Sequence, residues 1–223
     1  FYTRAQFGEG EIDYRDYRTT ISLTGEKPTD NYRQETDTIS RLVYGLASAY
    51  MLTGKDRYLE AAEKGTEYLR DHMRFYDSDE NIVYWYHGID VHGNREDKVF
   101  ASEFGDDFDA IPAYEQIYAL AGPIQTYRVT GDPAIMRDTE MMIDLFDRFF
   151  LDTELGCYFS HLDPITLDPR SDALGENKGK KNWNSVGDHA PAYLINLVLA
   201  TGNERYAKML EYTFDTITEH FPN

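Results

Sequence analysis

Cysteine is almost missing from this 223-residue sequence, which contains only Cys157. A single thiol excludes an internal disulfide and any zinc site built from several cysteines. The sequence also lacks an uninterrupted apolar run of about 18 residues, the length that predicts a membrane-spanning helix. We therefore expect neither a disulfide framework nor a chain that crosses a bilayer.

Basic residues are few. The chain has 22 Lys and Arg but 40 Asp and Glu, so its formal net charge is −18. Such a field repels phosphate backbones and anionic lipids, so neither nucleic acid nor a membrane surface is an expected partner. Hydrophobic residues are plentiful at 41%, with 18 Tyr and 12 Phe, which favours a folded core over disorder. We expect a soluble, cytoplasmic protein of one domain, or one large piece of a bigger one.

A repeated unit organises the chain. Thr-Gly pairs at 53–54, 130–131 and 201–202 each follow an apolar helical pattern and precede a second, half-polar one. Glycine suits the left-handed residue that ends a helix, and Asp132-Pro133 suits the start of the next. The pattern predicts three αα-hairpins, at about 36–74, 106–150 and 186–221, with apolar inner helices and half-polar outer helices. The predicted fold is all-α, either an α/α toroid or a solenoid.

The links between these hairpins are long. Residues 82–94 (IVYWYHGIDVHGN) are aromatic and β-branched, which predicts short β-hairpins in the connecting loops. Long links in a compact domain are usually functional or mobile, and in a ring of helix pairs they crowd one mouth. We divide the chain into an irregular N-terminal arm, 1–35, and a partial toroid, 36–223.

Three segments then resemble the N-acylglucosamine 2-epimerase superfamily, which includes cellobiose 2-epimerases and aldose–ketose isomerases. They are 41–62 (RLVYGLASAYMLTGKDRYLEAA), 114–132 (YEQIYALAGPIQTYRVTGD) and 182–206 (NWNSVGDHAPAYLINLVLATGNERY). The resemblance implies an (α/α)6 barrel that moves a proton at C2 of a small carbohydrate, with histidines as acid and base and with no metal or cofactor. It also implies further catalytic histidines on later inner helices, beyond Asn223. Three of six hairpins are present, so a homodimer partner or a missing C-terminal half would complete the ring.

The resemblance implies site residues one position at a time. Arg41 and Tyr44 match an Arg-x-x-Tyr pattern whose arginine faces the substrate, and Tyr114 matches a tyrosine that opens the next inner helix. Asn184 and His189 match an Asn…His pattern whose histidine lines the sugar pocket. One departure is Ala192, which stands where family members often carry glutamate.

The residues themselves leave alternatives open. His189, with Asp188, Asn184 and Trp183 close by, is a general-base candidate because imidazole titrates near neutrality. It could equally be a structural histidine that bonds to a loop carbonyl. Arg41 is expected to be buried on its apolar helix, where it would either pair with a carboxylate such as Asp37 or direct its guanidinium at sugar oxygens.

Other candidates are weaker. Each candidate near the mouth has a structural alternative in packing, capping or a solvated loop. Three further histidines are expected to lie on the surface. No tight metal-ligand spacing such as HExxH occurs, so no metal site is expected. The mouth candidates are Tyr114, Gln116, Asp106, Asp107, Asp109, Trp85, Tyr86, His87, His161 and Trp183, and the surface histidines are His72, His92 and His220.

Three functions compete at this point. The first is a sugar epimerase or isomerase that works through an enediolate, with His189 as one acid/base. The second is a glycoside hydrolase on the same toroid, resembling unsaturated glucuronyl hydrolases, with an acid among the aspartates and with Arg41, Lys180 and Lys181 focusing positive charge. The third is a non-catalytic helical-repeat module or inactive fragment whose exposed inner-helix surface seeks a partner.

Overall fold

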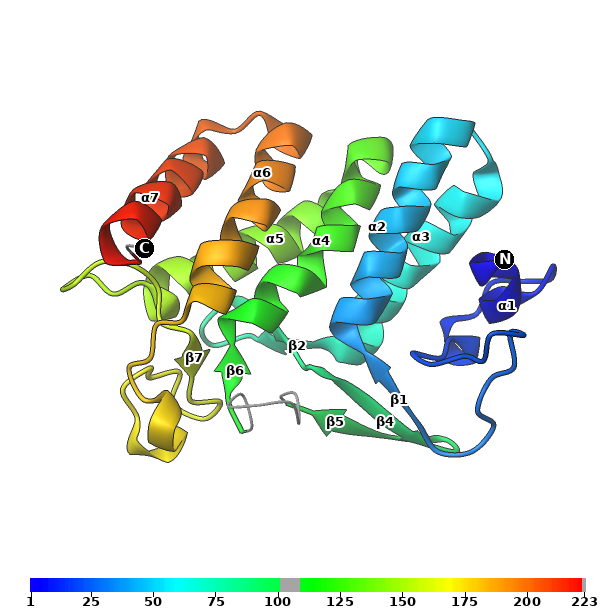
Figure 1. Ribbon diagram of the computed structural model, residues 1–223, viewed down its shortest axis with the longest axis horizontal. Coiled ribbons are helices and arrows are strands. Elements are labelled where there is room, and N and C mark those ends of the chain that lie inside the picture. Colours follow the sequence, from blue (N-terminus) through cyan, green and yellow to red (C-terminus); the bar gives the residue numbers. More distant parts are fainter. Residues whose placement is uncertain (101–108, 222–223) are drawn as a thin grey trace.

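The computed structural model describes residues 1–100 and 109–221. Six helices form three αα-hairpins, as predicted, and the first helices of the three hairpins pack side by side with α4 in the middle (Figure 1). The second helices pack against their own first helices and form the other layer. The hairpins are α2 (Thr36–Thr53) with α3 (Asp56–Tyr68), α4 (Ala113–Thr130) with α5 (Pro133–Leu145), and α6 (Ala190–Thr201) with α7 (Glu204–His220).

The Thr-Gly pairs make the turns inside the hairpins. Gly131 is left-handed, with φ of 68° and its N–H bonded to the carbonyl of Tyr127. The hydroxyl of Thr130 donates to its own helix and accepts the N–H of Asp132, whose carboxylate then caps α5. The threonine hydroxyls of Thr53-Gly54 and Thr201-Gly202 make the same two bonds. Asn203 also caps α7, whereas Lys55 makes no side-chain cap on α3.

A close crossing joins α2 to α4. Pro123 lies inside α4, and because proline has no N–H, the carbonyl of Ala119 loses its helical partner. The hydroxyl of Ser40 on α2 donates to that carbonyl at 3.3 Å and accepts the N–H of Gly122 at 2.9 Å. A side chain at position 122 would collide with the Ser40 carbonyl, since an added Cβ would lie 2.2 Å from it.

Short strands gather at the end where α2, α4 and α6 begin, below the helices in Figure 1. The predicted β-hairpins are present, but residues 82–94 divide between two different sheets. One sheet has the order β1-β4-β5, and the other two are two-stranded. The strands are β1 (Tyr32–Glu35), β2 (Arg74–Asp77), β3 (Ile82–Trp85), β4 (Gly88–His92), β5 (Arg95–Val99), β6 (Ile111–Pro112) and β7 (His161–Leu162).

The N-terminal arm is anchored on α3 and on the sheet. It contains a short helix, α1 (Tyr2–Phe7), and ends in strand β1. Tyr14 is buried and donates a hydrogen bond to the carbonyl of Ala61 on α3 at 2.8 Å. The side-chain amide of Gln34 in β1 donates to the carbonyls of Tyr14 and Tyr17. The arm is therefore held by buried hydrogen bonds, even though its sequence shows no helical period.

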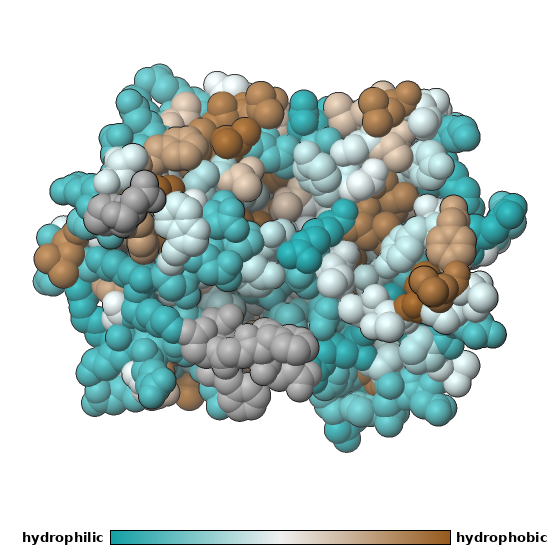
Figure 2. Space-filling view, in the orientation of Figure 1, coloured by the Kyte–Doolittle hydropathy of each residue, from teal (hydrophilic) through white to brown (hydrophobic). Residues whose placement is uncertain are grey.

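Large apolar side chains remain exposed on the inner helices. They include Met51 and Leu52 near the end of α2 and Ile195 and Leu199 on α6. Figure 2 shows hydrophobic patches near the upper ends of these helices, away from the strands. Among the described residues, no helix is both long enough and apolar enough to span a membrane.

Candidate active site

The first candidate site residue is Arg41, in the second turn of α2. Its guanidinium lies over the ring of Tyr118, 4.4 Å from the centroid, and Nη2 is 3.5 Å from the hydroxyl oxygen of Tyr114. Nη1 is 3.1 Å from a carboxylate oxygen of Asp37. The expectation of a buried guanidinium is wrong, because the side chain is 51% exposed. Arg41 combines the expected ion pair with an open edge that can meet a ligand.

His189 lies against the same two tyrosines. Its ring centroid is 4.8 Å from those of both Tyr114 and Tyr118, and its side chain is only 13% exposed. Nδ1 is hydrogen-bonded to the backbone carbonyl of Asn184. A carbonyl only accepts, so Nδ1 must carry the proton, and in the neutral ring Nε2 holds the lone pair. Nε2 is 3.8 Å from the nearer oxygen of Asp188, too far for a hydrogen bond.

A π-helical turn, Trp183–His189, delivers this histidine to the start of α6. The expected helix start near 186 is therefore shifted, and its first turns are wider than α-helical ones. The turn is capped by Asn182, whose side-chain oxygen accepts the N–H of Ser185 at 2.8 Å. π-Helical turns are rare and occur frequently at functional sites.

Trp183 points toward a different neighbour. Its ring meets Phe221 edge-on at 5.7 Å and folds over Gly187, where an added Cβ would lie 2.3 Å from the indole. Tyr44 is one turn beyond Arg41 and partly exposed, and Asp188 and the side chain of Asn184 are exposed. The structure thus brings Arg41 and His189 together through Tyr114 and Tyr118, which both of them contact. No such contact with these residues joins the side chains of Tyr44, Asn184 or Trp183 among the described residues, and Asp188 comes within 3.8 Å of His189.

Tyr118 is the residue that the sequence analysis missed. It follows Tyr114 by four positions and therefore lies on the same face of α4, so its place was available from the helical period. Burial, with the nearby charges of Asp37 and Glu115, raises the pKa of Tyr114 to about 12, although Arg41 opposes the shift. Tyr114 therefore keeps its proton at neutral pH and can donate it in a hydrogen bond.

A second group was also missed, the pair of His87 and Glu115. The sequence placed His87 among the weaker mouth candidates, with packing as its structural alternative, and gave no sign of a role for Glu115. In the structure His87 Nδ1 lies 2.7 Å from Glu115 Oε2, and both side chains are buried. Burial raises the pKa of Glu115 to about 7, although the hydrogen bond and charge of His87 lower it.

The remaining candidates occupy structural positions. Gln116 is buried, and its amide exchanges hydrogen bonds with the backbone of Trp85. His161 is buried in β7, and His72 is half-buried beside Glu96. His92 and His220 are exposed, as expected.

The aspartates of the loop before α4 divide into two groups. Asp109 is exposed in a turn with φ of 58°. Asp106 and Asp107 lie outside the described residues. Within 1–100 and 109–221, no three His, Cys, Asp or Glu side chains are grouped so that they could hold a metal ion.

Comparison with known proteins extends these observations. No protein-family model matches the chain. The chain is 29% identical over 116 residues to cellobiose 2-epimerase of Bacteroides fragilis, an alignment that covers 50% of this chain and 25% of that protein. Cellobiose 2-epimerase of Spirochaeta thermophila superposes with a TM-score of 0.68 at 19% identity, over 92% of this chain and 47% of that one. A sugar epimerase from a ruminal bacterium superposes with a TM-score of 0.66 at 21% identity, over 91% of this chain and 48% of that one.

The fold class follows from these superpositions. D-mannose isomerase (TM-score 0.60) and an unsaturated glucuronyl hydrolase (TM-score 0.54) share the fold at lower similarity. The predicted α/α toroid type is confirmed, and so is the resemblance to the N-acylglucosamine 2-epimerase superfamily. The chain spans about half the length of the solved structures, and its alignment covers a quarter of the curated relative.

Proposed function

We propose that this chain supplies part of the active site of a sugar 2-epimerase or aldose–ketose isomerase, with His189 as one acid/base. The observation that carries the proposal is the hydrogen bond from His189 Nδ1–H to the Asn184 carbonyl, which leaves Nε2 as the basic atom of a ring that packs against Tyr114 and Tyr118. Arg41 contacts the same two tyrosines. Similarity to cellobiose 2-epimerases supports it.

The chemistry begins with an open-chain sugar. Nε2 of His189 takes the proton from C2, and the electrons of the C–H bond form a C1–C2 double bond while the carbonyl π electrons move to O1. The product is an enediolate whose negative charge lies on oxygen. Arg41 and the protonated hydroxyl of Tyr114 are placed to stabilise that charge, which is where preorganised donors act most strongly.

The intermediate is then protonated again. Delivery of a proton to the opposite face of C2 gives the epimer. Delivery of a proton to C1, with transfer of the O2 proton to O1 so that the carbonyl forms at C2, gives the ketose. Either outcome needs a second acid, which we place outside the described residues, on a homodimer partner or on a further part of the toroid. The substrate is a small carbohydrate, and the reaction as written uses no cofactor.

The test is exchange of the C2 proton with solvent. The protein is incubated in D2O with N-acetylglucosamine, mannose, glucose or cellobiose, and loss of the H2 signal is followed by proton NMR. His189→Ala should slow exchange by about 10²-fold or more, the range of general-base catalysis. His220→Ala, which changes an exposed histidine on α7, is the matched control. Unchanged exchange in His189→Ala would remove this residue from the mechanism.

Glycoside hydrolysis is the second candidate, because an unsaturated glucuronyl hydrolase shares the fold. It requires a carboxylic acid at the mouth, and Asp188 is the described candidate nearest to His189. Loss of activity in Asp188→Asn, with His189→Ala tolerated, would favour it over the epimerase. A non-catalytic module would instead show no turnover and would self-associate through its exposed inner-helix surface.

A further inference from the structure

His87 connects the start of α2 with the start of α4. Its backbone carbonyl accepts the N–H of Thr36 at 2.8 Å, and the Thr36 hydroxyl donates to the carbonyl of Tyr86 at 2.6 Å. These bonds satisfy groups at the N-terminal end of α2 that have no partner within the helix. The His87 side chain turns the other way, toward Glu115 in the first turn of α4.

The His87–Glu115 pair is enclosed rather than displayed to solvent. Glu115 is 1% exposed and His87 7%. One carboxylate oxygen, Oε2, accepts from His87, while Oε1 is buried without a hydrogen-bond partner among the described residues. A buried carboxylate in this position depends on its one partner, because removing that partner would leave it desolvated and unpaired.

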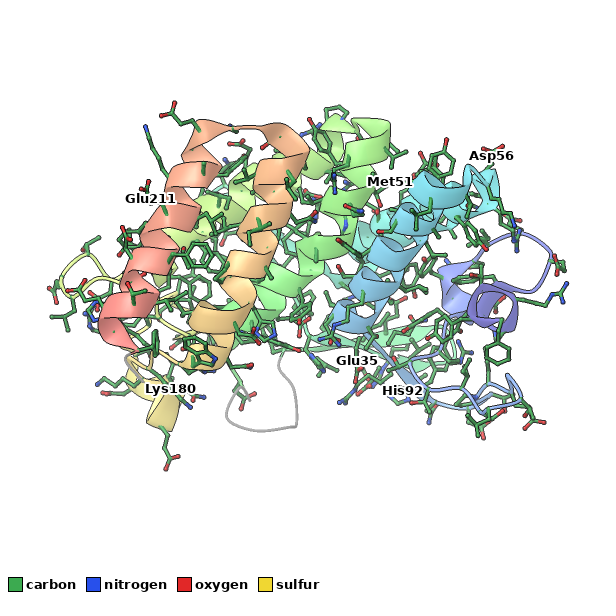
Figure 3. All side chains as sticks on the ribbon, turned by 45° about the horizontal axis from the view of Figure 1, so that its top comes forward. Glu35, Met51, Asp56, His92, Lys180 and Glu211 are labelled. Atoms are coloured by element: carbon green, nitrogen blue, oxygen red, sulfur yellow. The ribbon has the colours of Figure 1, made fainter. Side chains whose placement is uncertain are left out.

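The groups that face His87 come from three elements. Glu115 belongs to α4, Glu35 ends β1 with an oxygen 3.9 Å from His87 Nε2, and Asp37 lies in the first turn of α2. Figure 3 shows Glu35 at this end of α2. Burial lowers the pKa of His87, but the hydrogen bond and charge of Glu115, with Glu35 and Asp37, outweigh it and raise that pKa. The carboxylates around His87 therefore favour its protonated form.

His87 and Glu115 are each connected to Arg41 through a neighbouring residue in the chain. Thr36, bound by the His87 backbone, precedes Asp37, which pairs with Arg41 at 3.1 Å. Glu115 follows Tyr114, whose hydroxyl oxygen is 3.5 Å from Arg41. Any shift of the start of α2 against the start of α4 therefore moves Arg41 relative to its tyrosines.

We propose that His87 and Glu115 are positioning residues: their buried hydrogen bond fixes α2 against α4 and so holds the Arg41 guanidinium over Tyr118. The catalytic consequence rests on the proposed function, but the structural consequence does not. The pair touches no substrate. It acts through the placement of Arg41, and its loss should lower kcat, since Arg41 stabilises a charge that appears only as the enediolate forms.

The experiment compares three variants of the full chain. His87→Asn keeps an N–H donor near the position of Nδ1, whereas His87→Leu removes the donor. The matched control is His92→Leu, at the exposed end of β4 on the same chain segment (Figure 3). The structural readout is the chemical shift of the Arg41 side-chain NMR signals. The ring current of Tyr118 displaces these signals from their ordinary positions when the guanidinium lies over the ring. The signals are assigned to Arg41 because they are missing from the spectrum of Arg41→Lys.

We expect the Arg41 signals to be displaced by the Tyr118 ring in the unmodified chain, in His87→Asn and in His92→Leu. In His87→Leu we expect them to return to their ordinary positions. In the C2-exchange assay His87→Leu should lose about 10–100-fold in kcat/KM, mostly through kcat, as expected when a group that stabilises the enediolate is displaced. If His87→Leu fails to fold, the double variant His87→Leu/Glu115→Met replaces it, because exchanging a whole buried pair for apolar residues is often tolerated.

The outcomes separate the two proposals. Arg41 signals that stay displaced in folded His87→Leu or in the double variant would overturn the positioning role, whatever the activity. Signals that move as expected, in a chain that exchanges no C2 proton with any sugar, would support the positioning role and count against the proposed function. Equal loss in His87→Asn and His87→Leu would also overturn the role of the Nδ1 donor.

Discussion

Gly122 offers the sharpest test of how the site is assembled, because α4 crosses α2 there at close range. An alanine at this position would place its Cβ 2.2 Å from the Ser40 carbonyl oxygen and 2.8 Å from Cβ of Val43. Both obstacles belong to the backbone or to the stem of a β-branched side chain, so neither can rotate away. The helices must move apart by about 1 Å, and the Ser40 hydrogen bond to Gly122 must lengthen.

The magnitude follows from two opposing effects. Overpacking a tight core costs about 1–3 kcal/mol, and a rigid backbone obstacle places this site near the upper value. Alanine in place of glycine inside a helix returns about 0.5–1 kcal/mol. We therefore expect Gly122→Ala to lower the free energy of unfolding by about 2 kcal/mol. The same separation draws Arg41 away from Tyr118, so binding should weaken as well.

Gly45 is the matched control, since it lies on α2 and an added Cβ there would meet nothing within 4 Å. Gly45→Ala should raise the free energy of unfolding by about 0.5–1 kcal/mol. Urea denaturation measures the free energy of unfolding of both variants. If the m-value is the same in both, the difference in stability between them appears as a shift of the denaturation midpoint. A Gly122→Ala variant as stable as Gly45→Ala would show that the crossing is looser than described and would refute the reasoning.

Two further predictions concern buried carboxylates. Asp138 accepts from Arg70 at 2.8 Å and also pairs with Arg74, so Asp138→Asn should lower the free energy of unfolding by about 2–3 kcal/mol, measurable by urea denaturation. Burial opposes ionisation of Asp152, but Lys181 at 2.7 Å and two backbone N–H groups outweigh it and lower its pKa from 3.8 to about 2. Its contribution to stability is present above pH 3.8 and is lost as pH falls toward 2. Asp152→Asn should therefore flatten the acid limb of a stability–pH curve, and an unchanged limb would contradict the assignment.

The hairpins could be predicted from the sequence because their determinants are local. Each Thr-Gly pair combines a left-handed glycine with a threonine hydroxyl that serves both helices, and both features are encoded within a few residues. The register of the strands could not be predicted in the same way. Gln34 pairs with Ile89 across more than fifty residues, and no local pattern in either segment specifies that partner.

The site divides along the same line. Arg41 and Tyr114 were found through a resemblance, and Tyr118 lay within reach of the helical period. The π-helical turn at Trp183–His189 was not, since α- and π-helical turns draw on the same residues and differ only in which carbonyl each N–H reaches. Glu115 was missed for another reason. A glutamate in the first turn of a helix is ordinary on a surface, and only the fold shows that this one is buried.

The preference for His189 over Asp37 or Glu115 as the proposed base rests on how these two carboxylates are paired. Asp37 is paired with Arg41, and Glu115 is hydrogen-bonded to His87, so the carboxylates in the first turns of α2 and α4 already have a partner. The third helix start carries a histidine whose one donor is bound by a backbone carbonyl. A carboxylate held by a cation is a weaker base than a free one, whereas the carbonyl fixes His189 with its lone pair on Nε2. The arrangement therefore favours proton transfer by imidazole at this mouth, with the carboxylates holding the cations in place around it.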